Sequence, residues 1–260
     1  MQKPSWRLFA VFLVIQLFGS NSLFAAPEDE HVILLHGGLI TSFSMLRVQY
    51  ALENEGYHVH NVNYPSRAGS IKKLADDAIA PAIVECERAG AVKISFVTHS
   101  MGAILLRSYL ASHSVSLLGR VVMLGPPNHG SEVADKLGHF WVYKKIFGPT
   151  MLEMTTATNS LPNTLGAANF CLGIIAGDRT IGPISSFLIP GRDDGMISIE
   201  RTKLAGMADH LVMHTTHPFM TINQEVIRQA IYFLKNGRFN HEVSSKPWWN
   251  RLFKLEWNQL

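Results

Sequence analysis

Charged residues are scarce in this sequence. They make up 17% of its 260 residues, whereas 47% are hydrophobic, and typical soluble domains carry roughly 25% charged residues. This balance excludes a disordered, solvated chain. The 20 glycines and 12 prolines follow no short period, which excludes collagen-like and low-complexity chains. Without an internal repeat or a linker, the length favours one α/β domain.

Cysteine is rarer still. The two cysteines, Cys86 and Cys171, lie far apart and form no C-x-x-C motif or zinc cluster. A disulfide and two buried thiols both fit their surroundings, a helical stretch and a strand-like run. Of the 12 histidines, His210 and His214 are spaced i,i+4, but they fall in a strand-like run. The sequence therefore predicts no metal site.

A long transmembrane run is also missing. The apolar stretch 8–18 is shorter than the roughly 20 residues that span a bilayer. It follows Lys3 and Arg7 and precedes the small residues of 19–26, and no cysteine for a lipid anchor comes after it. This pattern predicts a signal peptide over residues 1–25, and hence an exported protein, periplasmic or secreted. An uncleaved N-terminal anchor is the alternative.

The C-terminal tail, residues 237–260, contains three of the five tryptophans. A helix from Pro247 would place cations on one side and an apolar stripe on the other, interrupted by Glu256; the stripe consists of Trp249, Leu252, Phe253 and Leu260. Such a helix could lie on a membrane surface. A tail that packs back on its own domain fits equally well.

The basic charge of the chain belongs to its two ends. The formal net charge is +3, but without residues 1–25 the chain has 21 Lys and Arg against 20 Asp and Glu. Without the tail as well, 17 basic residues face 18 acidic ones. No basic helix or phosphate-binding glycine loop is found between the ends, so we expect no nucleic-acid partner.

Strand-like and helical patterns alternate in the middle of the chain. Apolar or alternating runs predict strands at 31–35, 57–63, 92–97, 121–124, 170–176 and 211–213. Helical periodicity predicts helices at 70–88, 103–110 and 222–234. Helices between strands imply parallel pairing, so residues 26–236 are predicted to form an α/β domain. Its mostly parallel sheet has about six strands with helices on both faces. Residues 131–169 interrupt the alternation and are expected to form an irregular apolar flap or lid.

One serine stands where a strand passes directly into a helix. Ser100 follows the strand-like run ending at Thr98 and His99, and a helical pattern begins at once. A serine in such a sharp turn has a strained backbone and needs small neighbours. Gly102 meets that need, while Thr98 stands where glycine is usual. A plain helix N-cap is the alternative role for Ser100.

A serine hydroxyl needs a base, and the base needs an orienting acid. Asp194 and His217 follow Ser100 in the chain order of a strand–turn–helix nucleophile. Asp178, which also follows a strand, is the rival acid, and His214 is the rival base. Other polar side chains nearby are expected to be solvated loop charges or structural: Arg192, Asp193 and His129.

Five motifs occur in an order that resembles the α/β-hydrolase superfamily and, within it, the bacterial lipase-like serine esterases. They are His36-Gly37-Gly38, Thr98-His99-Ser100-Met101-Gly102, Pro127-Asn128-His129-Gly130-Ser131, Asp194-Gly195-Met196-Ile197-Ser198 and His217. Together they span about residues 31–235. The resemblance implies the α/β-hydrolase fold and a reaction that needs no cofactor.

The resemblance also implies a role for each site residue. Ser100 would be the nucleophile, His217 the general base and then acid, and Asp194 the residue that orients His217. The backbone N–H groups of Gly38 and Met101 would form the oxyanion hole. We therefore expect a serine hydrolase that cleaves a lipid-like carboxylic ester through an acyl-serine. An acyltransferase and a non-catalytic module that binds a lipid or a partner are the alternatives.

Overall fold

The protein is described by a computed structural model over residues 29–180 and 189–244. Six strands form one parallel sheet in the order β2-β1-β3-β4-β5-β6. They are β1 (Glu30–Leu35), β2 (His58–Val62), β3 (Lys93–His99), β4 (Leu118–Leu124), β5 (Leu172–Gly177) and β6 (Asp209–Met213). The predicted sheet of about six strands is confirmed, and every pairing in it is parallel.

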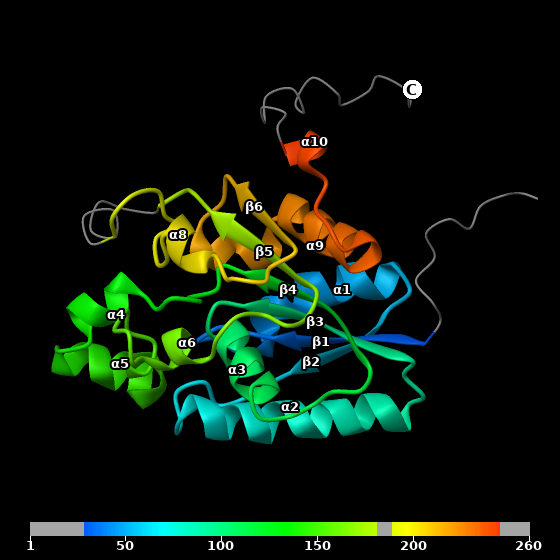
Figure 1. Cartoon of the computed structure of the whole chain (residues 1–260), viewed down its shortest axis with the longest axis horizontal. Helices are drawn as coiled ribbons and strands as arrows, with labels where there is room; N and C mark the ends of the chain where they lie inside the picture. Colours follow the sequence, from blue (N-terminus) through cyan, green and yellow to red (C-terminus); the bar gives the residue numbers. More distant parts are fainter. Residues whose placement is uncertain (1–28, 181–188, 245–260) are drawn as a thin grey trace, which may run out of the picture.

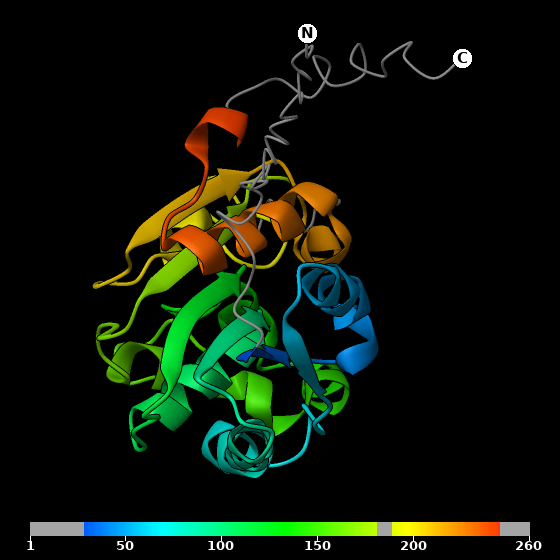
Figure 2. The same cartoon turned by 90° about the vertical axis from the view of Figure 1, so that its right-hand side faces the viewer.

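Helices cover both faces of the sheet, as Figures 1 and 2 show. The first face carries α2 (Ile71–Arg88) and α3 (Met101–Leu110), and the second carries α1 (Leu46–Asn54) and α9 (Gln224–Asn236). Shorter elements are η1 (Ser42–Met45), α8 (Ile199–Thr202), η2 (His217–Ile222) and α10 (His241–Ser244). The crossovers hold helices because parallel neighbours need long connections.

Alternate residues of each strand face opposite helical layers. In β1, Ile33 and Leu35 pack toward α2 and α3, whereas Val32 and Leu34 pack toward α1 and α9. All four are fully buried. Coverage on both faces explains why the strands are continuously apolar in sequence.

The segment 131–169 contains three short helices, so it is less irregular than the sequence suggested, and its role as a flap or lid stays a prediction. It contains α4 (Glu132–Leu137), α5 (Trp141–Leu152) and α6 (Leu161–Thr164), and α4 and α5 lie at one end of the sheet (Figure 1). Gly148, with φ of 71°, and Pro149 kink α5. Short helices and this kink explain the lack of one helical period in the sequence.

The ends of the chain are described only in part. The predicted signal peptide and the aromatic residues from Trp248 onward lie outside the described residues. In the ranges 29–180 and 189–244, no helix is both long and apolar enough to cross a membrane. Cys86 and Cys171 are both free thiols, so the disulfide left open by the sequence does not form in this structure.

Candidate active site

Ser100 occupies a strained turn between β3 and α3. Its backbone has φ of 53° and ψ of −121°, and its N–H donates to the Leu124 carbonyl at 2.9 Å. A Cβ on Gly102 would lie 2.6 Å from the Leu35 carbonyl oxygen, so glycine is required there. The predicted strand–turn–helix geometry is present, and the backbone of Ser100 has the positive φ that such a turn requires.

Thr98 fits in the position where glycine is usual. Its side chain is fully buried on β3, between Leu35 of β1 and Met123 of β4. Within the described residues its hydroxyl has no hydrogen-bond partner. The larger residue is therefore accommodated sterically, but a buried polar group remains unsatisfied.

The structure brings Ser100, His217 and Asp194 together in one chain of hydrogen bonds. The Ser100 hydroxyl lies 2.8 Å from Nε2 of His217, and Nδ1 of His217 lies 2.7 Å from Oδ2 of Asp194. The other carboxylate oxygen accepts the N–H groups of Met196 and Ile197, at 3.0 and 2.8 Å. Asp194 is fully buried, so these bonds determine its orientation.

The rival residues lie elsewhere and contact each other. Oδ1 of Asp178 lies 3.0 Å from Nδ1 of His214, and Arg192 pairs with the other carboxylate oxygen. His214 follows β6 and is largely exposed. Within the described residues, Ser100 is bonded to His217 and not to this pair.

Asp193 is not the solvated loop charge that we expected. It is buried, and its Oδ1 accepts the Thr180 hydroxyl at 2.6 Å and the Gly195 N–H at 2.8 Å. These bonds shape the turn that carries Asp194. Adjacent aspartates in one tight loop are indistinguishable by charge in the sequence, so only the fold separates their partners.

His99 contributes to the site, although sequence reasoning assigned it no role. Its Nε2–H donates to the His217 carbonyl at 3.1 Å, which ties the base to the end of β3. Burial, and then the nearby His217, lowers the pKa of His99 to about 3. The ring is therefore a neutral donor at any ordinary pH. In the sequence, the feature that could have identified His99 was its position directly before Ser100.

The loop after β1 is held by His36. Its Nδ1–H donates to the Gly37 carbonyl at 2.8 Å, its Nε2 accepts the Tyr64 N–H at 3.3 Å, and the Tyr64 hydroxyl donates to the His36 carbonyl. Burial lowers the pKa of His36, which favours this neutral form. Because a peptide plane is trans, a Gly37 carbonyl held by His36 directs the Gly38 N–H the opposite way.

An apolar cavity of about 360 Å³ opens beside Ser100. It is lined by Gly37, Gly38, Leu39, Ile40, His99, Ser100, Met151, Asp194, Gly195, Met196, His217 and Pro218. Met151 comes from α5, so the inserted helices contribute a wall of the cavity. Met101, the first residue of α3, is fully buried next to Ser100. Its N–H belongs to the first helical turn, where such groups lack intrahelical acceptors.

The remaining histidines singled out in the sequence lie apart from this cavity. Nδ1 of His129 lies 2.8 Å from the Asn163 amide oxygen, a structural contact within the insertion. Nε2 of His210 lies 3.0 Å from the Thr202 hydroxyl, whereas His214 contacts Asp178. His210 and His214 thus have separate partners and do not converge.

A known protein resembles part of this chain in sequence, and solved structures resemble it in fold. No family model matches the chain. A triacylglycerol lipase of Pseudomonas fragi is 32% identical over 76 residues, which is 29% of this chain and 26% of that lipase. The chain therefore matches only about a quarter of the length of this curated relative.

Solved structures match over much more of the chain. The mature lipase BlEst2 of Bacillus licheniformis superposes with a TM-score of 0.61 at 18% identity, over 81% of this chain and 94% of that one. The chain has the α/β-hydrolase fold. Another structure with this fold, Aspergillus fumigatus lipase B, has a TM-score of 0.59 at 13% identity, over 81% and 54% of the two chains. Phospholipase PlaB of Legionella pneumophila has a TM-score of 0.55 at 18% identity, over 67% and 45%. These α/β-hydrolase proteins are lipases and a phospholipase, and the chain resembles them in fold.

Proposed function

We propose that the protein is a serine carboxylic-ester hydrolase, an esterase or lipase that cleaves a lipid-like acyl ester through an acyl-serine intermediate. The observation that carries this proposal is the unbroken hydrogen-bond chain from Ser100 through His217 to Asp194, placed on a strained turn. A serine, a histidine and a buried carboxylate in this arrangement form an activated nucleophile on unrelated folds.

In the proposed reaction His217 removes the hydroxyl proton of Ser100 as the oxygen attacks the ester carbonyl. His217 then returns the proton to the leaving alkoxide, which departs as the alcohol and leaves an acyl-serine. Water, deprotonated by His217, attacks the acyl group; the bond to Ser100 then breaks, His217 returns the proton to the Ser100 oxygen, and the carboxylic acid is released. Asp194 accepts the Nδ1–H of His217 throughout, which keeps Nε2 free to accept the proton.

The oxyanion of the tetrahedral intermediate would bind to the N–H groups of Gly38 and Met101. Met101 begins α3, whose N-terminal dipole favours negative charge. The hydrogen bond from His36 to the Gly37 carbonyl supports the Gly38 N–H as an oxyanion donor, because it holds the peptide between Gly37 and Gly38 in one orientation. Backbone donors that are already oriented stabilise charge without reorganising during the reaction.

The lining of the cavity supports an acyl chain as the bound group. Leu39, Ile40 and Met151 line it, and Leu39 and Ile40 are also exposed to solvent. An apolar wall that continues onto the surface suits a substrate with one end in a lipid phase. The lipase and phospholipase names of the structural relatives agree with this substrate class.

Hydrolysis of p-nitrophenyl esters over a series of acyl lengths tests the proposal. We expect turnover in the wild type and at least a ~10³-fold loss of kcat in Ser100→Ala, because the nucleophile is removed. Ser112→Ala, at an exposed serine outside the site, is the matched control and should retain activity. No hydrolysis at any acyl length, or full activity in Ser100→Ala, would overturn the proposal.

Two further experiments distinguish the hydrolase from the two alternatives, a non-catalytic binding module and an acyltransferase. A fluorophosphonate probe should label the wild type and Ser112→Ala but not Ser100→Ala; a binding module without an activated serine would give no labelling. Addition of a competing alcohol reveals the acyl acceptor. Free acid as the main product indicates a hydrolase, and an ester of the added alcohol as the main product indicates an acyltransferase.

Export and membrane association are also proposed from the sequence alone. Residues 1–25 would direct export, and the tail from residue 237 would contact a membrane surface. Fractionation of cells expressing the full chain, a chain without residues 2–25 and a chain ending at residue 244 tests both. Loss of export in the first deletion, and release from membranes in the second, are expected.

A further inference from the structure

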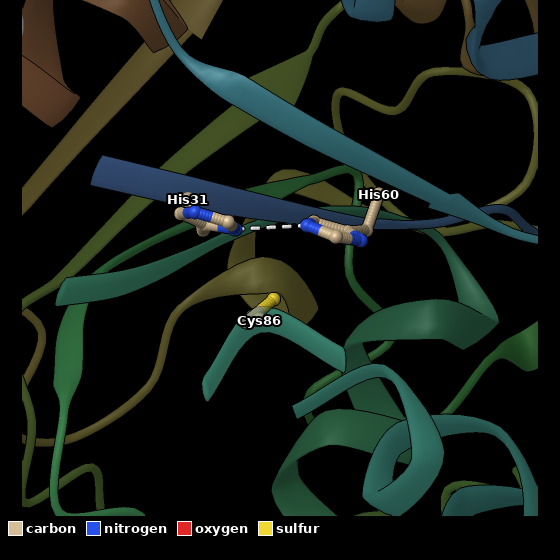
Figure 3. A group of neighbouring side chains, drawn as sticks. All are labelled: His31, His60 and Cys86. Atoms are coloured by element: carbon tan, nitrogen blue, oxygen red, sulfur yellow. Dashed lines mark hydrogen bonds between the residues drawn. The ribbon is translucent and has the colours of Figure 1, made fainter. Parts of the chain in front are cut away.

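Three side chains from three elements converge beneath the edge of the sheet, away from the cavity at Ser100. They are His31 of β1, His60 of the edge strand β2, and Cys86 near the end of α2 (Figure 3). One nitrogen of each imidazole and the Cys86 sulfur all lie within 4.8 Å of one another. His31 and Cys86 are buried, and His60 is half-buried.

The two histidines already share one hydrogen bond. Nδ1 of His31 lies 2.8 Å from Nε2 of His60, so one ring donates its proton to the lone pair of the other. Burial, and then the neighbouring His60 and His58, lowers the pKa of His31. The bond between the two rings needs a lone pair on one ring nitrogen, and the lone pair of an imidazole nitrogen is also the group that binds a metal ion.

We propose that His31, His60 and Cys86 bind one Zn²⁺ ion. Imidazole nitrogen and thiolate sulfur are the usual ligands of zinc, and three such ligands leave a fourth position for water. With Zn–N near 2.0–2.1 Å and Zn–S near 2.3 Å, donors around a tetrahedral zinc lie roughly 3.3–3.6 Å apart. The histidines would separate slightly and the sulfur would approach, changes within reach of side-chain rotation.

The proton positions and charges balance around such an ion. With Nε2 of His60 bound to zinc, its proton resides on Nδ1, which lies 3.8 Å from the Glu85 carboxylate. A carboxylate behind a ligating histidine orients the ring and raises its basicity. Thiolate is the form of cysteine that binds zinc, so Cys86 releases its proton to solvent when the ion binds. The thiolate and Glu85 together then match the 2+ charge of the ion.

A groove provides access to the cluster. A cavity of about 490 Å³ lies between β2 and α2, and its lining includes His60, Glu85 and Asp77. The ion would thus first contact His60, whose side chain is 16% exposed, and then bind the buried His31 and Cys86 as well. The acidic side chains in the groove attract cations.

The cluster is separate from the reaction centre. His31 is in register with Ile94 of β3, and Ser100 follows six residues later, roughly 20 Å along the strand. A bound ion would link β1, β2 and α2 and thereby fasten the edge strand of the sheet. We therefore assign the zinc a structural role, independent of the proposed hydrolase activity.

Cobalt(II) is a direct probe, because bound thiolate gives it a near-ultraviolet charge-transfer band. Full-length protein, reduced and freed of metal with a chelator, is titrated with Co²⁺. One equivalent should produce the band together with visible ligand-field bands, and Zn²⁺ should displace it. Cys86→Ser should lose the band, whereas Cys171→Ser, at the other free cysteine, should retain it. Absence of the band in the wild type, or its persistence in Cys86→Ser, would refute the site.

A second measurement covers the case in which a buried substitution prevents folding. His60→Gln alters the ligand that is not fully buried, and Glu85→Gln alters the exposed carboxylate behind it. Zinc affinity should fall ~10–100-fold in Glu85→Gln and further in His60→Gln. Zn²⁺ should raise the Tm of the wild type and of His113→Gln, a histidine outside the cluster, because it binds the folded state. A wild-type Tm that zinc leaves unchanged would contradict the proposal.

Discussion

At the scale of single residues, the site depends on positions where a side chain is absent as much as on those that react. Gly125 follows β4 with φ of 53°, and a Cβ there would lie 3.0 Å from both Asp194 Oδ2 and His217 Nδ1. The atoms that such a Cβ would crowd are the two that form the Asp–His hydrogen bond. The absence of a side chain at Gly125 is therefore a requirement of the proposed triad.

Gly125→Ala should lower kcat for ester hydrolysis by about 100-fold. The new methyl group displaces Asp194 and His217, and a misplacement of about 1 Å can cost that much in rate. Steady-state kinetics on a soluble ester measures the loss. Gly191→Ala is the matched control, since Gly191 also has positive φ but nothing within 4 Å of its Cβ position. Equal activity in the two variants would contradict this account.

Thr98→Val should stabilise the protein by about 1 kcal/mol. Valine has the shape of threonine and removes a buried hydroxyl that has no partner within the described residues. Thr202→Val, the control, should destabilise by about 1 kcal/mol, because the buried Thr202 hydroxyl contacts the Ile199 carbonyl and His210. Urea unfolding measures both changes. A loss of stability in Thr98→Val would mean that its hydroxyl is satisfied.

At the scale of elements, a buried arginine connects α3 to the inserted helices. Arg107 donates to the carbonyl oxygens of Asn128, Pro162 and Gly166 and to the Asn128 side chain, at 2.9–3.2 Å. Burial lowers its pKa to about 10, so it remains charged at neutral pH. The helix that begins at the nucleophile thus also positions α6 and the bend that follows it.

Arg107→Met should destabilise the protein by more than about 2 kcal/mol. It leaves several buried carbonyl oxygens without a donor, each at the cost of an unsatisfied group. Arg47→Met, at an exposed arginine, should change stability by less than about 0.5 kcal/mol. Thermal or urea unfolding of both variants measures the two changes in stability. Equal changes would show that Arg107 does not hold α3 and the inserted helices together.

At the scale of the whole molecule, exposed apolar side chains belong to the lining of the cavity or directly adjoin it in the chain. Ile40, which lines it, is 37% exposed, and Phe219, next to the lining residue Pro218, is 51% exposed. Val92 is 57% exposed but directly precedes β3, at the opposite end of the sheet from Ser100. An exposed apolar group at the mouth of a cavity is suited to contact with an aggregated lipid.

The double variant Ile40→Ser/Phe219→Ser should lose several-fold in activity on an emulsified long-chain ester. Its kcat/KM for a soluble short-chain ester should fall less than its activity on the emulsion, because the reacting groups are untouched. Val92→Ser removes a similar exposed apolar group at the far end and should leave both activities unchanged. If both activities of the double variant fell equally, the surface would have no specific role in lipid contact.

The sequence alone determined the layer architecture and the order of the motifs. Apolar strands such as 31–35 and the helical face of 70–88 are local patterns set by burial, so their periodicity predicted the parallel sheet. The turn at Ser100 was equally readable, because its geometry requires Gly102 two residues later. These features depend on neighbours along the chain.

The tertiary fold sets which distant side chains meet, including the set of Ser100, Asp194 and His217 that the family resemblance implied. It joined His217 to Asp194 and left Asp178 with His214, it buried Asp193, and it brought His99 to the His217 carbonyl. It also gathered His31, His60 and Cys86, which no spacing in the sequence relates. The physical reason is that parallel strands bring residues from separate crossovers to one end or face of the sheet, and a sequence pattern records only what lies within a few residues.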